Sequence, residues 1–165
     1  MGHPFQTGLR WLLWAAWTPA LLAASWEQSG EFAIRSYTNR EYSLSPQNWA
    51  LVQDRRGILY AGNTEGLLEF DGVRWRTIRL PKNGPVRSLA VDGQGKVYVG
   101  GHGEFGFLQP DGRGATEYVS LVDSVPEADR KFSSVWSVLT TPEGIVFSSY
   151  ERLFRKPPSG PLLVV

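Results

Sequence analysis

The chain has 165 residues, of which 42% are hydrophobic, 13% aromatic and 20% charged, with 18 glycines and 11 prolines. This composition is typical of a compact β domain with frequent turns. Cysteine is absent, which excludes a disulfide framework, thiol catalysis and cysteine-based zinc sites. The formal net charge is +1, and it becomes neutral if the residues before Trp26, whose only charge is Arg10, are removed. A neutral balance gives no support for nucleic acid or an anionic membrane surface as a partner.

The N-terminal stretch has the profile of a signal peptide. One arginine and no acid precede Trp11, and an apolar run follows up to Ala24. This run has the length of a signal-peptide core, whereas a membrane span needs about 20 residues. We expect residues 1–25 to be a helical signal peptide that contacts the rest of the chain little, with cleavage before Trp26. The alternative is an uncleaved N-terminal anchor, and both imply export.

Residues 26–46 are expected to form an extended segment that leads into the first repeated unit. Phe32, Ile34 and Tyr37 are spaced to add an outer strand to a neighbouring sheet. The polar stretch that follows, and Pro46, favour a turn or an edge position.

Residues 47–75 form a unit that occurs again downstream. The pattern D-x-x-G-x-x-Y that starts at Asp54 returns at Asp92, 38 residues later. The pattern G-x-L-x-x-D-G that starts at Gly66 returns at Gly106, 40 residues later, which predicts two extra residues in one loop of the second unit. Repeats of this length with strand-like content indicate a propeller or a solenoid.

A third, weaker copy follows the second after 49 residues. Trp136, Gly144 and Phe147 then correspond in order to Arg87, Gly95 and Tyr98 of the second copy. Thr141 stands where the aspartate would be. The spacing predicts that Phe147 shares a packing layer with Tyr60 and Tyr98. It also predicts one set of equivalent structural turns, made by Asp54, Gly57, Asp92, Gly95 and Gly144.

Each unit contains short apolar runs separated by turn residues. In the first unit the runs are 49–53, 58–61 and 66–70, and a fourth contains Trp75 and Ile78. Asp and Gly punctuate them, and the apolar residues recur at a spacing of two, which argues against an amphipathic helix. Four short antiparallel strands make one propeller blade. The predicted fold is therefore all-β, an incomplete β-propeller of about three four-stranded blades in units 47–80, 86–121 and 134–165.

These motifs together resemble a known family. The run PQNWALVQDRRGILYAGNTEGLLEFDGVRWR, followed by VRSLAVDGQGKVYVGGHGEFGFL, is similar to two-component regulator propeller repeats in bacterial sensor proteins that carry a triple-tyrosine-motif domain. The resemblance covers about residues 32–154. It implies an exported, ligand-sensing propeller that precedes a transmembrane helix and a cytoplasmic output module such as a histidine kinase. It also implies a membrane-anchored, homodimeric parent protein, of which this chain would be a fragment.

Motifs for catalysis and cofactors are weak. The segment from Gly101 to Gly106 matches G-x-G-x-x-G, but a strand and a hairpin signal follow it where a dinucleotide site needs a helix. No calcium loop and no G-x-S-x-G motif occur, and His102 is the only histidine outside the leader. We therefore expect no cofactor, no metal and no catalytic residue in this chain.

Binding remains the expected role. The start of each blade's first strand and the loop between its second and third strands should gather at one face, while the turns at Asp71 and Asp111 fall on the opposite face. Aromatic and planar polar side chains at these places would suit a small polar ligand such as a carbohydrate. The predicted ligand-binding residues are Gln47, Asn48, Asn63, Glu65, Arg87, His102, Glu104 and Tyr150. Ser88, Ser134, Trp49 and Trp136 also lie at these places, and for the two tryptophans a core position is an equal alternative.

The predicted function is thus the non-catalytic sensing portion of a transmembrane receptor, on the periplasmic or extracellular side of the bacterial inner membrane. Two alternatives stay open. One is an exported propeller enzyme that acts on glycans or lactone-like compounds, and the other is a protein-interaction scaffold.

Overall fold

The computed structural model describes residues 34–165, and residues 36–165 form one compact unit. The predicted signal peptide and most of the segment that follows it lie outside the described residues. Within the described part, no helix is long and apolar enough to cross a membrane.

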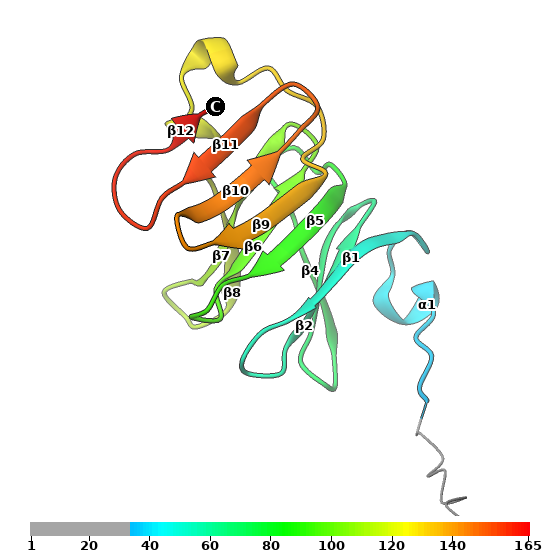
Figure 1. The fold of residues 1–165 in the computed structure, drawn as a ribbon. Helices are drawn as coiled ribbons and strands as arrows, with labels where there is room; N and C mark the ends of the chain where they lie inside the picture. The colour runs from blue at the N-terminus through cyan, green and yellow to red at the C-terminus, as the bar shows by residue number, and fades with distance from the viewer. Residues whose placement is uncertain (1–33) are drawn as a thin grey trace, which may run out of the picture. The chain divides into compact units, whose positions relative to one another are not determined.

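The unit consists of three antiparallel sheets of four strands each, and each sheet is built from consecutive strands (Figure 1). Sheet 1 contains β1 (Asn48–Gln53), β2 (Leu59–Asn63), β3 (Gly66–Phe70) and β4 (Trp75–Ile78). Sheet 2 contains β5 (Val86–Val91), β6 (Val97–Gly101), β7 (Glu104–Pro110) and β8 (Thr116–Ser120). Sheet 3 contains β9 (Ser137–Thr141), β10 (Gly144–Ser148), β11 (Leu153–Lys156) and β12 (Leu163–Val164). The predicted all-β class is confirmed.

The first strands of the three sheets lie side by side, β1 against β5 and β5 against β9 (Figure 1). Two short 3-10 turns, Val122–Ser124 and Glu127–Asp129, occupy the connection between sheets 2 and 3. This arrangement is consistent with consecutive propeller blades.

Apolar side chains fill the two spaces between neighbouring sheets. Tyr60 and Leu67 of sheet 1 pack with Val97 and Val99 of sheet 2 in one cluster. The second cluster joins sheets 2 and 3 around Phe105. Because side chains alternate between the two faces of a strand, sheet 2 contributes residues to both clusters.

The repeated D-x-x-G-x-x-Y pattern builds the same turn twice. Oδ1 of Asp54 accepts the backbone N–H of Arg56 at 2.8 Å and of Ile58 at 3.1 Å. In sheet 2, Oδ1 of Asp92 accepts the equivalent pair of backbone N–H groups. The tyrosine closes the motif, since the hydroxyl of Tyr98 donates to Oδ2 of Asp92 at 3.2 Å. Burial and the nearby Asp92 raise the pKa of Tyr98 to about 12, so this hydroxyl keeps its proton at neutral pH.

Gly57 in the first of these turns has φ +84°, which disfavours any residue with a Cβ. We expect Gly57→Ala to lower the free energy of unfolding by about 1 to 2 kcal/mol, because the side chain is forced into the left-handed region. Urea denaturation measures the loss. Gly93→Ala is the matched control, since Gly93 is not in that region and its Cβ would meet nothing within 4 Å. Equal losses in the two variants would contradict the role of the backbone conformation.

The third hairpin departs from the predicted register. Thr141 pairs with Gly144, so two residues form the turn. In the corresponding turn of sheet 2, three residues separate Asp92 from Lys96. Gly144 therefore begins β10 and is not equivalent to Gly95, although its φ is +124°. Because the turn of sheet 3 is one residue shorter, the Phe147 side chain faces sheet 2. Val146 then occupies the position that Tyr98 has in sheet 2. The prediction that Phe147 shares a layer with Tyr60 and Tyr98 is wrong for this reason.

Two residues join the second and third strands of sheets 1 and 2, and in sheet 3 a hydrogen bond from the Ser149 N–H to the Arg152 carbonyl closes a two-residue turn beyond the strand ends. Asn63 pairs with Gly66, and Gly101 pairs with Glu104. The two extra residues of the second unit thus lie in the longer strand β7 and not in this loop. Glu104 is equivalent to Gly66 in this pairing and belongs to a strand, whereas the sequence had placed it in the loop.

The segment before sheet 1 is not wholly extended. Residues 39–42 form the short helix α1 (Asn39–Tyr42), which begins with a capping box between Thr38 and Glu41. Tyr42 is buried and packs beside Trp75 of β4, with ring centroids 5.6 Å apart. The expected outer strand is absent from the described part of this segment.

Candidate functional site

A β-bulge marks the start of the first strand in sheets 1 and 2. The pairing register shifts between Asn48 and Ala50 and between Val86 and Ser88, so that Trp49 and Arg87 are the extra residues. Trp136 stands just before β9, with its backbone N–H bonded to the carbonyl of Ser148. Bulges re-aim side chains and are common beside functional sites.

These three residues, which lie at the starts of the three sheets, form a stack. The guanidinium carbon of Arg87 lies 3.8 Å from the ring centroid of Trp49 and 5.1 Å from that of Trp136. The two indole rings lie 6.3 Å apart at 79°. Trp49 and Trp136 are 39% and 43% exposed, so they form a surface and are not core residues. Stacking on two indoles is a favourable environment for a guanidinium.

Arg87 has no hydrogen-bond acceptor for two of its nitrogens. Nε and Nη1 are both buried, and no group of the described residues accepts a hydrogen bond from either atom. An unsatisfied buried donor of a charged group costs free energy unless an acceptor reaches it. The stack therefore holds hydrogen-bonding capacity that the protein itself does not use.

The two-residue loops at the same end of the sheets surround this stack. Their first residues are Thr64, His102 and Tyr150. The hydroxyl of Thr64 accepts from Nε1 of Trp49 at 3.1 Å, and the ring of Tyr150 lies 6.0 Å from that of Trp136. Tyr150 is 83% exposed, which extends the aromatic surface toward solvent. We call Trp49, Arg87, Trp136 and Tyr150 the aromatic cluster.

His102 lies at this end but is tied to the start of sheet 3. Its Nδ1 lies 3.1 Å from Oγ of Ser134, and the two residues form an isolated bridge. A Ser–His pair supports nucleophilic catalysis when a third group orients the imidazole. No carboxylate of the described residues bonds the other ring nitrogen, so the pair is not a triad. The described residues also contain no group of three metal-ligating side chains.

Three of the predicted ligand-binding residues instead hold the protein together. Asn63 is fully buried, and its amide donates to the Ser45 carbonyl at 2.7 Å and to Oδ1 of Asn48 at 2.8 Å. Its own Oδ1 accepts the backbone N–H of Glu65. Gln47 is exposed and contacts Thr64 through its carbonyl and its amide. Asn63 and Asn48 thus anchor the approach to β1, and the buried Asn63 amide is not free for a ligand.

Glu104 also lies away from the candidate ligand surface. It is 3% exposed, and its Oε1 accepts the hydroxyls of Ser120 at 2.5 Å and Tyr118 at 3.0 Å. Burial raises the pKa of Tyr118, and the charge of Glu104 acts in the same direction. Tyr118 packs against the cluster between sheets 1 and 2, so the Glu104 side chain that it contacts points into the same space. Its assignment to a ligand surface does not fit this geometry.

The loop acids on the aromatic side are solvated. Glu65 is exposed, and so is Glu151, which occupies the equivalent position in the third loop. Oε2 of Glu151 accepts the backbone N–H and hydroxyl of Ser133, and these hydrogen bonds lower its pKa. A carboxylate pair between Glu65 and Glu104 is not formed, since one side chain is at the surface and the other is enclosed.

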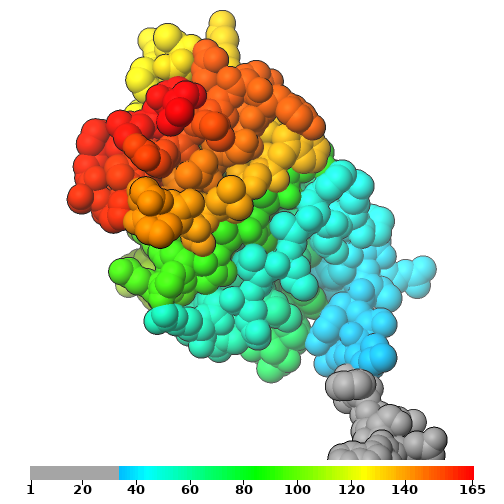
Figure 2. All heavy atoms as spheres, viewed as in Figure 1, coloured from blue at the N-terminus to red at the C-terminus, as the bar shows by residue number. Residues whose placement is uncertain are grey.

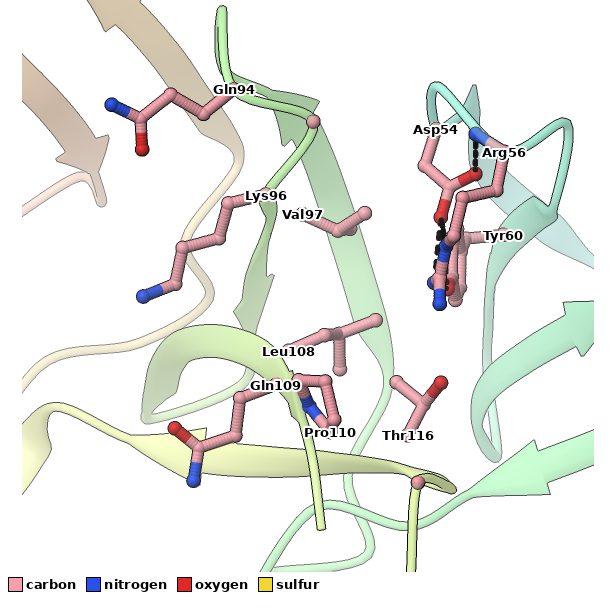
Figure 3. A pocket seen from close by; sticks show the side chains of 12 residues that line it. Asp54, Arg56, Tyr60, Gln94, Lys96, Val97, Leu108, Gln109, Pro110 and Thr116 are labelled. Carbon is pink, nitrogen blue, oxygen red and sulfur yellow. Dashed lines mark hydrogen bonds and ion pairs between the residues drawn. The ribbon is translucent and has the colours of Figure 1, made fainter.

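A pocket at the other end of the sheets has a different character (Figure 3). Its volume is about 350 Å³, and it lies between the first turns of sheets 1 and 2. The guanidinium of Arg56 lies beside the ring of Tyr60 and is bonded to Asp54 at 2.7 Å (Figure 3). Lys96 extends away from this group toward the other side of the opening (Figure 3). The Asp54 and Arg56 charges satisfy one another, so we assign the pocket a structural role.

Comparisons with known proteins add little. No protein-family model matches the chain. No curated protein matches it either. Among solved structures, the chain is similar to the extracellular domain of a one-component system from B. thetaiotaomicron, at 15% identity and a TM-score of 0.40. The similarity covers 79% of this chain and 23% of that one, so this chain spans less than a quarter of the other's length.

The geometry selects a smaller set than the sequence did. Of the predicted ligand residues, Arg87 and Tyr150 join the aromatic cluster, and His102 lies in the neighbouring loop. Trp49 and Trp136, for which the sequence left a core position open, prove to be its exposed faces. Thr64 was missed, although its place one residue after Asn63 in a two-residue loop was the available signal.

Proposed function

We propose that this chain is the non-catalytic, ligand-binding part of an exported bacterial receptor, built as consecutive blades of a β-propeller. Three features support the proposal. The sheets repeat with the same strand order, the repeats resemble two-component regulator propellers in sequence, and one end carries the aromatic cluster. In this proposal the parent protein is anchored in the inner membrane and passes ligand occupancy to an output module.

The observation that carries the proposal is the Arg87 guanidinium held between two exposed indoles with unsatisfied donors. Indole and phenol faces bind the apolar face of a sugar ring, and a guanidinium donates to its oxygens. A carbohydrate satisfies both requirements at once. We therefore propose an oligosaccharide as the ligand class, bound across Trp49, Arg87 and Trp136.

Binding of oligosaccharides tests the proposal directly. A set of neutral and uronic-acid disaccharides is titrated into the full chain, and isothermal titration calorimetry and tryptophan fluorescence report binding. We expect Arg87→Ala and Trp136→Ala to weaken binding of the responding sugar by about ten- to a hundredfold, since each removes a contact worth about 1 to 3 kcal/mol. His102→Ala should have a smaller effect, because its ring is bonded to Ser134.

Arg113→Ala is the matched control for this titration. It removes the same charge as Arg87→Ala, but Arg113 is exposed in the turn that begins at Asp111, at the opposite end of the sheets. Its affinity should equal that of the unaltered chain. Normal binding by Arg87→Ala and Trp136→Ala would overturn the site, and no response to any sugar in the set would overturn the ligand class.

A further inference from the structure

The two indole rings of the aromatic cluster are held in different ways. Nε1 of Trp49 donates a hydrogen bond to the hydroxyl oxygen of Thr64, at 3.1 Å. Trp136 makes no such bond within residues 34–165, where its ring contacts those of Trp49 and Tyr150. The orientation of Trp49 is therefore linked to one hydroxyl group in the loop between β2 and β3.

Thr64 is itself firmly placed. It is the first residue of the two-residue loop that the pairing of Asn63 with Gly66 closes. Its backbone N–H donates to the Gln47 carbonyl at 3.3 Å, which ties the loop to the residue just before β1. While the hydroxyl accepts from Trp49, it can donate its own proton to Oε1 of Gln47, 3.4 Å away. Thr64 thus presents a fixed acceptor to the indole.

Trp49 has few other restraints on its rotamer. It is the extra residue of the bulge at the start of β1 and is 39% exposed. In the observed rotamer its ring centroid lies 3.8 Å from the guanidinium carbon of Arg87. Rotation about the Cβ–Cγ bond would turn the face of the ring off the guanidinium and would break the bond to Thr64. The same hydrogen bond therefore maintains the stack.

We propose that Thr64 is a positioning residue, whose hydroxyl holds the Trp49 indole in the orientation that binds ligand. The inference rests on the proposed ligand-binding role of the aromatic cluster. Sheets 1, 2 and 3 follow one another in one continuous surface, seen as cyan, green and orange in Figure 2, so a displaced ring alters a surface that all three sheets share. A side chain that is ordered before binding loses less conformational freedom when ligand arrives, and affinity is higher for this reason.

Thr64→Val tests this role, because valine has nearly the shape of threonine but lacks the hydroxyl. Thr64→Ser keeps the hydroxyl and is the conservative rescue. Thr140→Val is the matched control, since Thr140 is exposed and lies beside the turn at the far end of β9. Urea denaturation checks that each variant is folded.

The first measurement needs no ligand. The indoles of Trp49 and Trp136 lie 6.3 Å apart at 79°, so their electronic transitions couple and give a paired band in the far-ultraviolet circular dichroism of the full chain. Trp136→Phe gives the spectrum without this coupling. We expect Thr64→Val to resemble Trp136→Phe, and Thr64→Ser and Thr140→Val to resemble the unaltered chain. An unchanged band in Thr64→Val, or an equal loss in Thr64→Ser or Thr140→Val, would overturn the proposal.

The second measurement is the affinity for whichever neutral or uronic-acid disaccharide binds the unaltered chain. Thr64→Val should bind it about three- to tenfold more weakly, which is the cost of ordering one side chain, while Thr64→Ser and Thr140→Val should bind it normally. Normal affinity of Thr64→Val despite a lost band would overturn the positioning role. If no disaccharide binds the unaltered chain, the proposed ligand class fails, and the band then decides whether Thr64 orients Trp49.

Discussion

Replacing Glu104 by alanine is expected to lower the free energy of unfolding by about 3 kcal/mol. The half-buried Tyr118 and Ser120 both donate their hydroxyls to Oε1 of Glu104, and alanine leaves both without this acceptor. Each unsatisfied buried group costs about 1 to 3 kcal/mol. Urea denaturation followed by circular dichroism measures the difference, and Glu104→Gln should recover part of it because its amide oxygen still accepts.

Glu65→Ala is the control for this measurement. Glu65 lies in the preceding loop of sheet 1 and is exposed, so its removal should change stability by no more than about 0.5 kcal/mol. The comparison also separates structure from ligand binding. A Glu104→Ala variant that unfolds like the unaltered chain but no longer binds the responding sugar would show that Glu104 contacts ligand.

Replacing Phe147 by alanine is expected to cost about 3 to 5 kcal/mol, the range for truncating a buried aromatic ring. Phe147 is fully buried, and its ring lies 4.6 Å from that of Phe105. Phe105 in turn stacks on Phe154 at 4.7 Å. The ring therefore joins sheet 2 to sheet 3, and its loss should loosen the whole third sheet. Thermal and urea unfolding measure the effect.

Val146→Ala provides the matched test of register. Val146 is half-buried and faces away from sheet 2, so its truncation should cost less than about 1.5 kcal/mol. If the costs were reversed, the third sheet would follow the spacing expected from sequence, with Phe147 at the position of Tyr98. The two-residue turn at Pro142 and Glu143 would then be incorrect.

Local patterns predicted much of the fold. The D-x-x-G-x-x-Y motif contains all the groups that its turn needs, since the aspartate accepts nearby backbone N–H groups and the tyrosine bonds the same carboxylate. Alternating apolar residues placed the strands of sheet 1 within one or two residues of their observed ends. Interactions of this range depend on residues a few positions apart and can be recognised from a single sequence.

Hairpin register was harder to predict. A spacing of 40 between two matching patterns does not say whether the extra residues lengthen a loop or a strand, and here they lengthen β7. One residue fewer in the third turn reverses the face of every side chain that follows in β10. Both errors arose because residues were counted along the sequence, whereas the pairing between strands sets the position of each side chain. They placed Glu104 and Phe147 wrongly.

The sequence by itself determined the all-β class, the repeat, the turn chemistry and the set of polar and aromatic residues at one end of the strands. Only the tertiary structure decided which of these residues meet. Arg87 contacts Trp49 and Trp136 because three first strands lie side by side with their starting residues aimed at one another. Asn63 and Glu104 have equally suitable chemistry, but packing turns them inward, where neighbouring groups satisfy them. Such contacts join residues far apart in the chain, and no local pattern encodes the direction in which each side chain points.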